Sequence, residues 1–448
     1  MAKSFVSTTN PCRLCRPLGA CLAFRGVEDS MVLLHGSQGC STYMRRYISS
    51  HFREPVDIAS SALSENQAVY GGAANLKQGI RNVVAKYSPA VLGVATTCLA
   101  ETIGDDVRMA ISELMEEEPA LREITIVPVS TPSYNGGHMD GFNDACVAIL
   151  ENCAESGDQR GEINLFPGFV SPADLRYLKE VMASFGVAPM VLPDISDTLD
   201  GVIDGSLNRI PTGGARLADI RLAGSSAASI EFGQTFPESQ SPALFLEKRF
   251  GVRAERLPLP IGIRYSDLFF ESLERLTGRA TSEIHRNERG RLVDAMVDAH
   301  KYLFGKRAVI YGDADFVIAM TSFLVDLGIQ PVVCASGGGG ADYLADLEAL
   351  TSPLEETPAL LARTDFDDIR EHSREAAANL LIGSSKGNHI ARELGIPLVR
   401  IGYPIHDRFG GQRILHAGYR GALNLLDLLT NTIIAREEAE LGHGYSYM

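Results

Sequence analysis

The sequence predicts an α/β fold, in which parallel sheets are flanked by helices. Along its 448 residues, short apolar runs alternate with stretches of helical periodicity, and this alternation is typical of strands joined by crossover helices. The composition is that of an ordinary globular protein, with 45% hydrophobic and 22% charged residues, which excludes collagen and disordered chains. At about 100–200 residues per domain, the length is enough for several domains.

The expected elements follow from the apolar pattern, taken in chain order. Stretches with helical periodicity lie at 172–185, 316–327 and 388–394. Linkers are expected near 154–161, which is rich in Glu, Ser, Gly and Asp, and near 268–285. They divide the chain into three Rossmann-like α/β domains at 1–155, 160–275 and 285–448. The expected strands are the apolar runs 32–34, 90–95, 124–129, 162–166, 188–192, 308–310, 331–334, 380–382 and 397–401.

The net charge of the chain indicates which class of molecule it binds. The chain carries 41 basic and 56 acidic side chains, a net charge of −15 with neutral histidines. Such an acidic surface argues against nucleic acid and for a partner with a basic face. No apolar run reaches the roughly 18 residues of a membrane span, and the N-terminus lacks the apolar core of a signal peptide. We therefore expect a cytoplasmic protein with no membrane partner.

Cysteine placement is more informative than cysteine number. Four of the eight cysteines fall within the first 40 residues, and in a reducing cytosol such crowding favours metal or redox chemistry over disulfides. Four of the eight cysteines, one of them within the first 40 residues, lie in apolar surroundings and are expected to be small buried hydrophobic residues: Cys21, Cys146, Cys153 and Cys334.

Two cysteines are expected at junctions between a strand and a helix. Cys40 follows the 32–34 strand and a Gly-x-x-Gly turn, and Cys98 opens a helix expected to continue through Ile111. A thiolate at a helix start faces free backbone N–H groups, which lower its pKa and suit it to metal ligation. Cys15 lies in an irregular segment between Pro11 and Pro17.

These cysteines favour an iron–sulfur cluster over zinc. Cys12 and Cys15 form a CxxC motif, but no second pair or histidine follows at the spacing of a zinc ribbon. Cys15, Cys40 and Cys98 have no fourth partner nearby in the sequence, which suggests thiolates converging on a cluster shared with another chain.

Two other classes of protein fit the sequence less well. A purely structural subunit would need no thiolates at three such positions. A sugar- or nucleotide-binding protein would need a phosphate loop or an acidic contact to a ribose, but Gly383–Gly387 has the wrong spacing. The four glycines at 337–340 are expected to form a loop without a strand–turn–helix context.

Ordered motifs along nearly the whole chain resemble the β-type subunits of nitrogenase component 1. This family includes the catalytic β subunit, the β-like member of the scaffold on which the cofactor is assembled, and nitrogenase-like reductases with other substrates. The motifs lie at 10–20, 35–40, 51–55, 96–101, 103–106, 131–133, 291–294, 312–316 and 400–404.

The resemblance implies a shared cluster and an active site on another chain. Cys15, Cys40 and Cys98 match the cluster ligands of the β-type chain, and the cluster is either the 8Fe–7S P-cluster or a 4Fe–4S cluster. Ser133 matches a serine that ligates the oxidised P-cluster, and Tyr43 lies beside the Cys40 ligand. Because the α-type partner holds the active-site cofactor, no catalytic residue is expected on this chain.

The resemblance also implies the assembly. The β-type chain pairs with an α-type subunit to form α2β2 and receives electrons from an ATP-dependent iron protein. Tyr70 matches a segment near the docking face for that protein. Glu54, Asp294 and Asp298 match a metal site between β subunits. For the two aspartates, which share a helix face, the alternative is a solvated acidic face paired with neighbours such as Arg289.

Two functions follow from these observations. The first is a β-type subunit of a nitrogenase-like reductase, which relays electrons towards dinitrogen or another small molecule, such as an organosulfur compound. The alternative is the β-like subunit of the cofactor-assembly scaffold. The three cysteines and Ser133 favour the relay. Residues 192–201 and 211–214, together with the short N-terminus, favour the scaffold.

Overall fold

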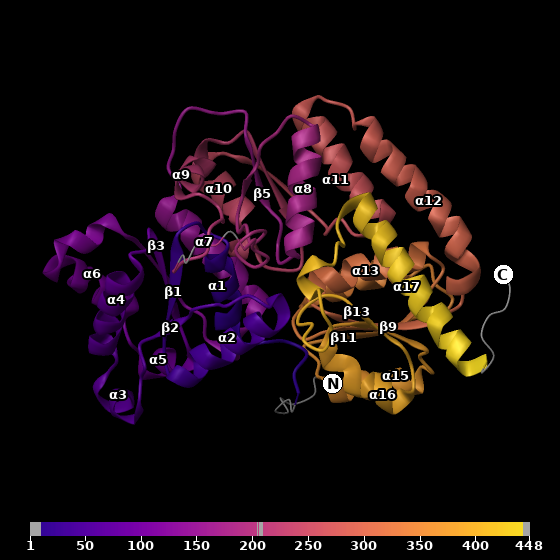
Figure 1. Ribbon diagram of the computed structural model, residues 1–448, viewed down its shortest axis with the longest axis horizontal. Helices are drawn as coiled ribbons and strands as arrows, with labels where there is room; N and C mark the ends of the chain where they lie inside the picture. Colours follow the sequence, from indigo (N-terminus) through magenta and orange to yellow (C-terminus); the bar gives the residue numbers. More distant parts are fainter. Residues whose placement is uncertain (1–9, 204, 206–208, 442–448) are drawn as a thin grey trace. The chain divides into compact units, whose positions relative to one another are not determined.

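The computed structural model describes residues 10–203, 205 and 209–441, and the strands in this part form three sheets (Figure 1). One compact unit consists of 14–232 and 236–256; the other consists of 257–448, 233–235 and the segment ending at Arg13. The expected α/β class is confirmed. Each sheet falls within one of the three expected domains, whose boundaries stay a prediction. Among the described helices, none is long and apolar enough to cross a membrane.

The first sheet belongs to the first unit and has the strand order β2-β1-β3-β4, with every pair parallel. Its strands are β1 (Ser30–His35), β2 (Ala59–Ser60), β3 (Val91–Thr96) and β4 (Thr125–Val129). The accompanying helices are α1 (Arg16–Arg25), α2 (Gln38–Phe52), α3 (Glu65–Tyr70), α4 (Ala73–Tyr87), α5 (Cys98–Ile103), α6 (Val107–Glu117), α7 (His138–Cys153) and the 3₁₀ turns η1 (Pro119–Glu123) and η2 (Ser133–Asn135).

Helices cover both faces of this sheet. Leu76 and Ile80 of α4 lie four residues apart and pack with Leu33 and Leu92 in a core that also includes α6. On the other face, Gly93 leaves room for α1, because a Cβ there would lie 2.4 Å from the ring of Phe24. Figure 1 shows α1 and α7 on one side of β1 and β3, with α4 and α6 on the other. Every residue of β1 and β3 is buried, as their apolar runs predict.

The second sheet has the order β6-β5-β7-β8. Its elements are β5 (Ile163–Phe166), β6 (Met190–Val191), β7 (Ala228–Phe232), β8 (Arg253–Leu257), α8 (Pro172–Ser184), α9 (Leu217–Arg221), α10 (Pro242–Phe250), η3 (Leu222–Ser225) and η4 (Glu238–Gln240).

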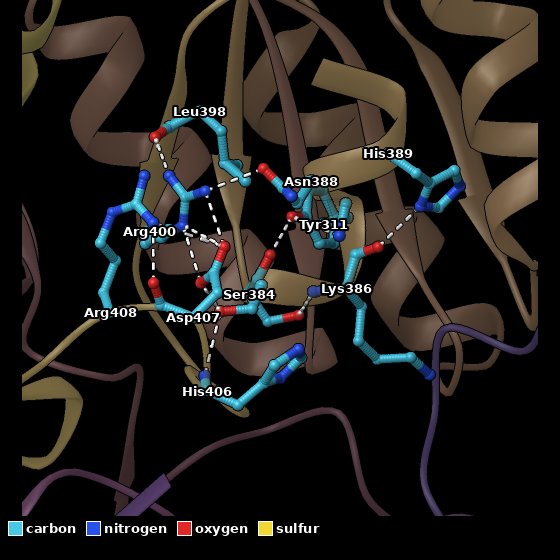
Figure 2. Close-up of polar contacts among 12 residues, drawn as sticks. Tyr311, Ser384, Lys386, Asn388, His389, Leu398, Arg400, His406, Asp407 and Arg408 are labelled. Carbon is cyan, nitrogen blue, oxygen red and sulfur yellow. Dashed lines mark hydrogen bonds and ion pairs between the residues drawn. The ribbon is translucent and has the colours of Figure 1, made fainter. Parts of the chain in front are cut away.

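The third sheet lies in the second unit and has the order β11-β10-β9-β12-β13. Figure 2 shows the polar contacts at the ends of its last strands, where Arg400 donates to Asp407 at 2.8 Å. Burial raises the pKa of Asp407, but hydrogen bonds from Arg400 and Ser385 outweigh it and hold the value at about 2. These contacts brace the loop after the last strand. The strands are β9 (Arg307–Gly312), β10 (Gln330–Ser336), β11 (Ala359–Ala362), β12 (Leu380–Gly383) and β13 (Leu398–Arg400).

Helices of the second unit occupy most of the remaining chain. They are α11 (Gly262–Thr277), α12 (Glu283–Leu303), α13 (Ala314–Asp326), α14 (Ala341–Thr351), α15 (Phe366–Glu375), α16 (Asn388–Leu394), α17 (Gly418–Leu441), η5 (Ser385–Gly387) and η6 (Gly411–Arg413).

Three expectations were wrong. Most of the expected linker at 268–285 is helical, because α11 and α12 are separated only by a turn closed by Gly278 in the left-handed conformation. The helix expected from Cys98 through Ile111 ends at Ile103, where Gly104 also adopts a left-handed conformation, and Asp106 caps a new helix. The glycines at 337–340 do lie between a strand and a helix, β10 and α14.

Candidate cluster-binding site

The candidate ligands lie at the carboxyl edge of the first sheet. β1 and β3 are parallel neighbours with His35 opposite Thr96, so the segments that follow them leave the sheet at the same edge. These segments touch, because a Cβ at Gly36 would lie 2.1 Å from Thr97 Oγ1. Glycine is therefore required there for the Cys40 and Cys98 segments to pack together.

Cys40 lies in the first turn of α2, as the sequence predicts. Ser37 is the residue before the helix, and its hydroxyl donates to Cys40 Sγ at 3.6 Å. The Cys40 residue is partly exposed. Its thiol therefore combines solvent access with a position at a helix N-terminus, where negative charge is favoured.

Cys98 is the first residue of α5 and is also partly exposed. The backbone N–H of Ser133 donates to Cys98 Sγ at 3.2 Å. Behind the thiol, Glu101 accepts hydrogen bonds from the hydroxyls of Thr96 and Ser130, each at 2.5 Å. These bonds tie α5 to the ends of β3 and β4, so the Cys98 side chain is held by a braced helix start.

Ser133 connects Cys98 to the N-terminal cysteine segment. Its Oγ accepts a hydrogen bond from the backbone N–H of Arg16 at 3.2 Å, while its own N–H is directed at Cys98 Sγ. A serine after Thr131-Pro132 would otherwise bond within its own turn. Here both described hydrogen bonds of Ser133 join it to residues outside that turn. One is to Cys98 Sγ, and the other is to Arg16, the residue after Cys15.

Cys15 immediately precedes α1 and is attached to the start of α7. It forms an isolated antiparallel bridge with Gly137. Next to it, the N–H of His138 donates to the Leu14 carbonyl at 3.0 Å. Tyr43, one turn beyond Cys40, lies close enough for electrostatic interaction with Cys15; burial, Tyr47 and then Cys15 raise the pKa of the Tyr43 hydroxyl. Cys15 is therefore near α2 as well as Ser133.

The remaining cysteines behave as expected for packed side chains. Cys21 and Cys146 are buried, and burial raises the pKa of Cys153 to about 11 and of Cys334 to about 12. Burial also raises the pKa of Cys12 to about 12. The N–H of Cys12 donates to the Thr364 carbonyl at 3.2 Å within the other compact unit. The Cys12–Cys15 motif is therefore split between two units.

The donor set suits a cluster better than a single ion. Within the described residues, no three His, Cys, Asp or Glu side chains are grouped so as to hold one metal ion. In a 4Fe–4S cluster the four thiolates bind different irons, so they stand farther apart than the ligands of a single ion. Three partly exposed cysteines and a serine, gathered at one sheet edge, fit such a group.

The sequence motifs contain a supporting network whose role was not predicted. His35 Nδ1 is 2.9 Å from Ser61 Oγ, and its Nε2 is 3.1 Å from Asp105. Burial lowers the pKa of His35 although Asp105 opposes it, so we assign Nε2 as the donor to Asp105 and Nδ1 as the acceptor from Ser61. The Gly72 N–H donates to Asp105 at 2.8 Å. The network joins β1 to the starts of α4 and α6.

The other predicted residues lie on other elements, with Tyr70 on α3, Glu54 just after α2 and the two aspartates on α12. Tyr70 is 87% exposed on α3, which has no buried residue. Asp294 and Asp298 are exposed and four residues apart on α12. Arg289, which the sequence suggests as an ion-pair partner for these aspartates, instead pairs with Asp267 at 2.8 Å. Glu54, in the first unit, accepts a hydrogen bond from the Gly201 N–H at 3.1 Å.

Known proteins resemble this chain over nearly its whole length. The family model described as nitrogenase component 1 type oxidoreductase matches residues 15–434. The nitrogenase molybdenum-iron protein beta chain of Methanococcus maripaludis is 38% identical over 445 residues, covering 96% of each chain. The nitrogenase vanadium-iron protein beta chain of Trichormus variabilis is 34% identical, covering 97% of this chain and 96% of its own.

A solved structure agrees. Nitrogenase Cp1 at pH 6.5 superimposes with a TM-score of 0.94 at 34% identity and covers 98% of this chain and 96% of its own. The chain therefore belongs to the nitrogenase component 1 type oxidoreductases.

Proposed function

We propose that this chain is the β-type subunit of a nitrogenase-like reductase and holds half of an interfacial iron–sulfur cluster. The observation that carries the proposal is the convergence of Cys15, Cys40 and Cys98 with Ser133 at one edge of the first sheet. The full-length similarity to nitrogenase beta chains supports the same role.

The number of candidate cysteines supports a shared cluster. A 4Fe–4S cluster is held by four thiolates, and this chain brings three candidates to the sheet edge. An α-type chain is the natural source of the missing ligands, and two such pairs would form α2β2. Whether the group is the P-type 8Fe–7S cluster or a 4Fe–4S cluster depends on the ligands that the partner supplies.

When bound, such a cluster would supply one-electron transfer. The residues of this chain would hold and orient it: the three thiolates anchor it, and the Ser133 N–H stabilises negative charge on Cys98 Sγ. The Ser133 hydroxyl, held by the Arg16 N–H, provides a hard oxygen donor beside two thiol donors. No group on this chain is proposed to touch the substrate.

The electron donor is proposed to be an ATP-dependent iron protein. Val69 is 76% and Tyr70 87% exposed, and they form a small apolar surface on α3 that suits a docking contact. The net charge of −15 favours a partner with a basic face. Asp294 and Asp298 with Glu54 stay a proposed metal site between β subunits.

The cofactor-assembly scaffold is the second candidate. The sequence of 192–201 favours it, but this segment has a structural role: Lys179 pairs with Asp194 at 2.9 Å and Arg176 with Asp200 at 2.6 Å. Ser133 separates the two functions, because a cluster that changes oxidation state gains more from a nearby hard oxygen donor than a storage cluster does.

Ser133→Ala tests the relay directly. We expect the complex purified with its α-type partner to keep its iron, because the three thiolates remain, but to show an altered oxidised-state spectrum and midpoint potential. Electron flux should fall about 10-fold or less, which is about 1.4 kcal/mol of barrier. The measurement is a potentiometric titration followed by electron paramagnetic resonance.

The matched control is Ser37→Ala, which removes a hydroxyl directed at Cys40 Sγ from a different loop. It should shift the potential without changing which oxidised-state signals appear. Superimposable titrations of wild type and Ser133→Ala would reject the relay and favour the scaffold.

A further inference from the structure

Arg16, which follows Cys15 and whose backbone N–H bonds Ser133 Oγ, also forms an ion pair through its side chain. Arg16 Nε donates to Asp144 Oδ2 at 3.0 Å, and the Nη2 of the same guanidinium also bonds that oxygen. The Arg16 and Asp144 side chains are only 14% and 20% exposed. Such a shielded pair interacts more strongly with nearby charge than a surface pair does.

The position of the Arg16–Asp144 pair is fixed by a hydrogen bond from Gln240 and by the close packing of α1 against α7. The side-chain amide of Gln240 donates to the second oxygen of Asp144 at 3.0 Å, so both carboxylate oxygens are engaged. Close packing of α1 and α7 leaves little freedom, because a Cβ at Gly141 would lie 2.0 Å from the Arg16 carbonyl oxygen. The carboxylate on α7 therefore holds the residue that links Cys15 to Ser133.

We propose that the Arg16–Asp144 pair is a positioning and charge-balancing device for the cluster site, with Asp144 cancelling the positive charge of Arg16, the residue that follows Cys15 and whose N–H bonds Ser133 Oγ. A positive charge near a redox group favours its reduced, more negative form and so raises the midpoint potential. Asp144 keeps the potential low by neutralising that charge, and it holds the Arg16 N–H in place for Ser133 Oγ. This inference rests on the proposed cluster-binding function.

Replacing Asp144 and replacing Arg16 should shift the midpoint potential in opposite directions. Asp144→Asn keeps the size of the side chain and an acceptor for Gln240 but leaves Arg16 charged, so the midpoint potential should rise. Arg16→Gln keeps the backbone N–H but leaves the carboxylate uncompensated. Because burial raises the pKa of Asp144, the potential should fall when it is measured at a pH high enough to keep that carboxyl ionised. In the double variant the charges are balanced again, and the potential should return towards the wild-type value.

The experiment uses the complex with the α-type partner and measures iron content, midpoint potential and the electron paramagnetic resonance spectrum of each variant. A purely structural role would move both single variants in the same direction and make the double variant worse. The matched control is Arg176→Gln with Asp200→Asn, an ion pair between α8 and the segment after β6, which should leave the potential unchanged.

Opposite shifts that cancel in the double variant, with iron retained, support the proposal. Equal potentials in all four proteins, or shifts of the same sign, overturn it. A wild-type complex without iron would instead contradict the proposed function, so the two failures are distinguishable.

Discussion

Cys40→Ala is expected to remove most of the iron from the complex with the α-type partner. Cys40 lies at the start of α2 and is partly exposed at the sheet edge, and an alanine there offers no ligand. Because cluster binding also stabilises the folded site, we expect weaker association of the subunits as well. Iron per complex, the visible spectrum and the subunit ratio after gel filtration measure these losses.

Cys334→Ala is the matched control. Cys334 is fully buried in β10, and its sulfur contacts only a hydroxyl among its described polar partners, Thr321 Oγ1 at 3.5 Å. Removing the sulfur should cost about 1 kcal/mol through the cavity it leaves, with iron unchanged. Full iron content and an unaltered spectrum in Cys40→Ala would contradict its role as a ligand.

Gly19→Ala is expected to disrupt the packing that supports Cys15. A Cβ at position 19 would lie 1.7 Å from the His138 carbonyl oxygen, a backbone atom that cannot rotate away. α1 and α7 must therefore separate, at a cost of about 3 kcal/mol or more. The same movement breaks the Cys15–Gly137 bridge. Thermal unfolding of the complex should begin at a lower temperature, and iron content should fall with it.

Gly290→Ala provides the comparison for this prediction. Gly290 lies within α12, and a Cβ there would meet no atom within 4 Å. Alanine should stabilise the helix by about 0.5–1 kcal/mol, because it restricts the unfolded backbone. Wild-type stability and iron content in Gly19→Ala would show that α1 and α7 are not packed backbone to backbone.

The sequence predicted the elements that have a continuous apolar run or a typical helix start. β1, β3 and β9 are buried apolar runs, and α8 begins at Ser171-Pro172, a typical helix start. β7 was missed because a buried glutamate, Glu231, interrupts its apolar run; Ser241 and Arg256 compensate that charge. β8 was missed because its sequence, Arg-Ala-Glu-Arg-Leu, resembles a charged surface rather than a strand.

The candidate site was predictable only where residues lie in recognisable motifs. Cys40 and Cys98 follow strands, so their shared edge follows from parallel topology. Asp144 lies 128 positions from Arg16, in the middle of an ordinary helix. No local pattern distinguishes such a buried carboxylate from an exposed one. Its role depends on packing between α1 and α7, which only the folded chain reveals.

The most direct test of the central claim is a potentiometric titration of the wild-type complex with its α-type partner, with iron and acid-labile sulfide measured on the same sample. We expect both elements to be present and a reversible paramagnetic signal that disappears when Cys15, Cys40 and Cys98 are all replaced by Ala. A complex that contains the α-type chain but keeps an unchanged signal and iron content in the triple variant would contradict cluster binding by this chain.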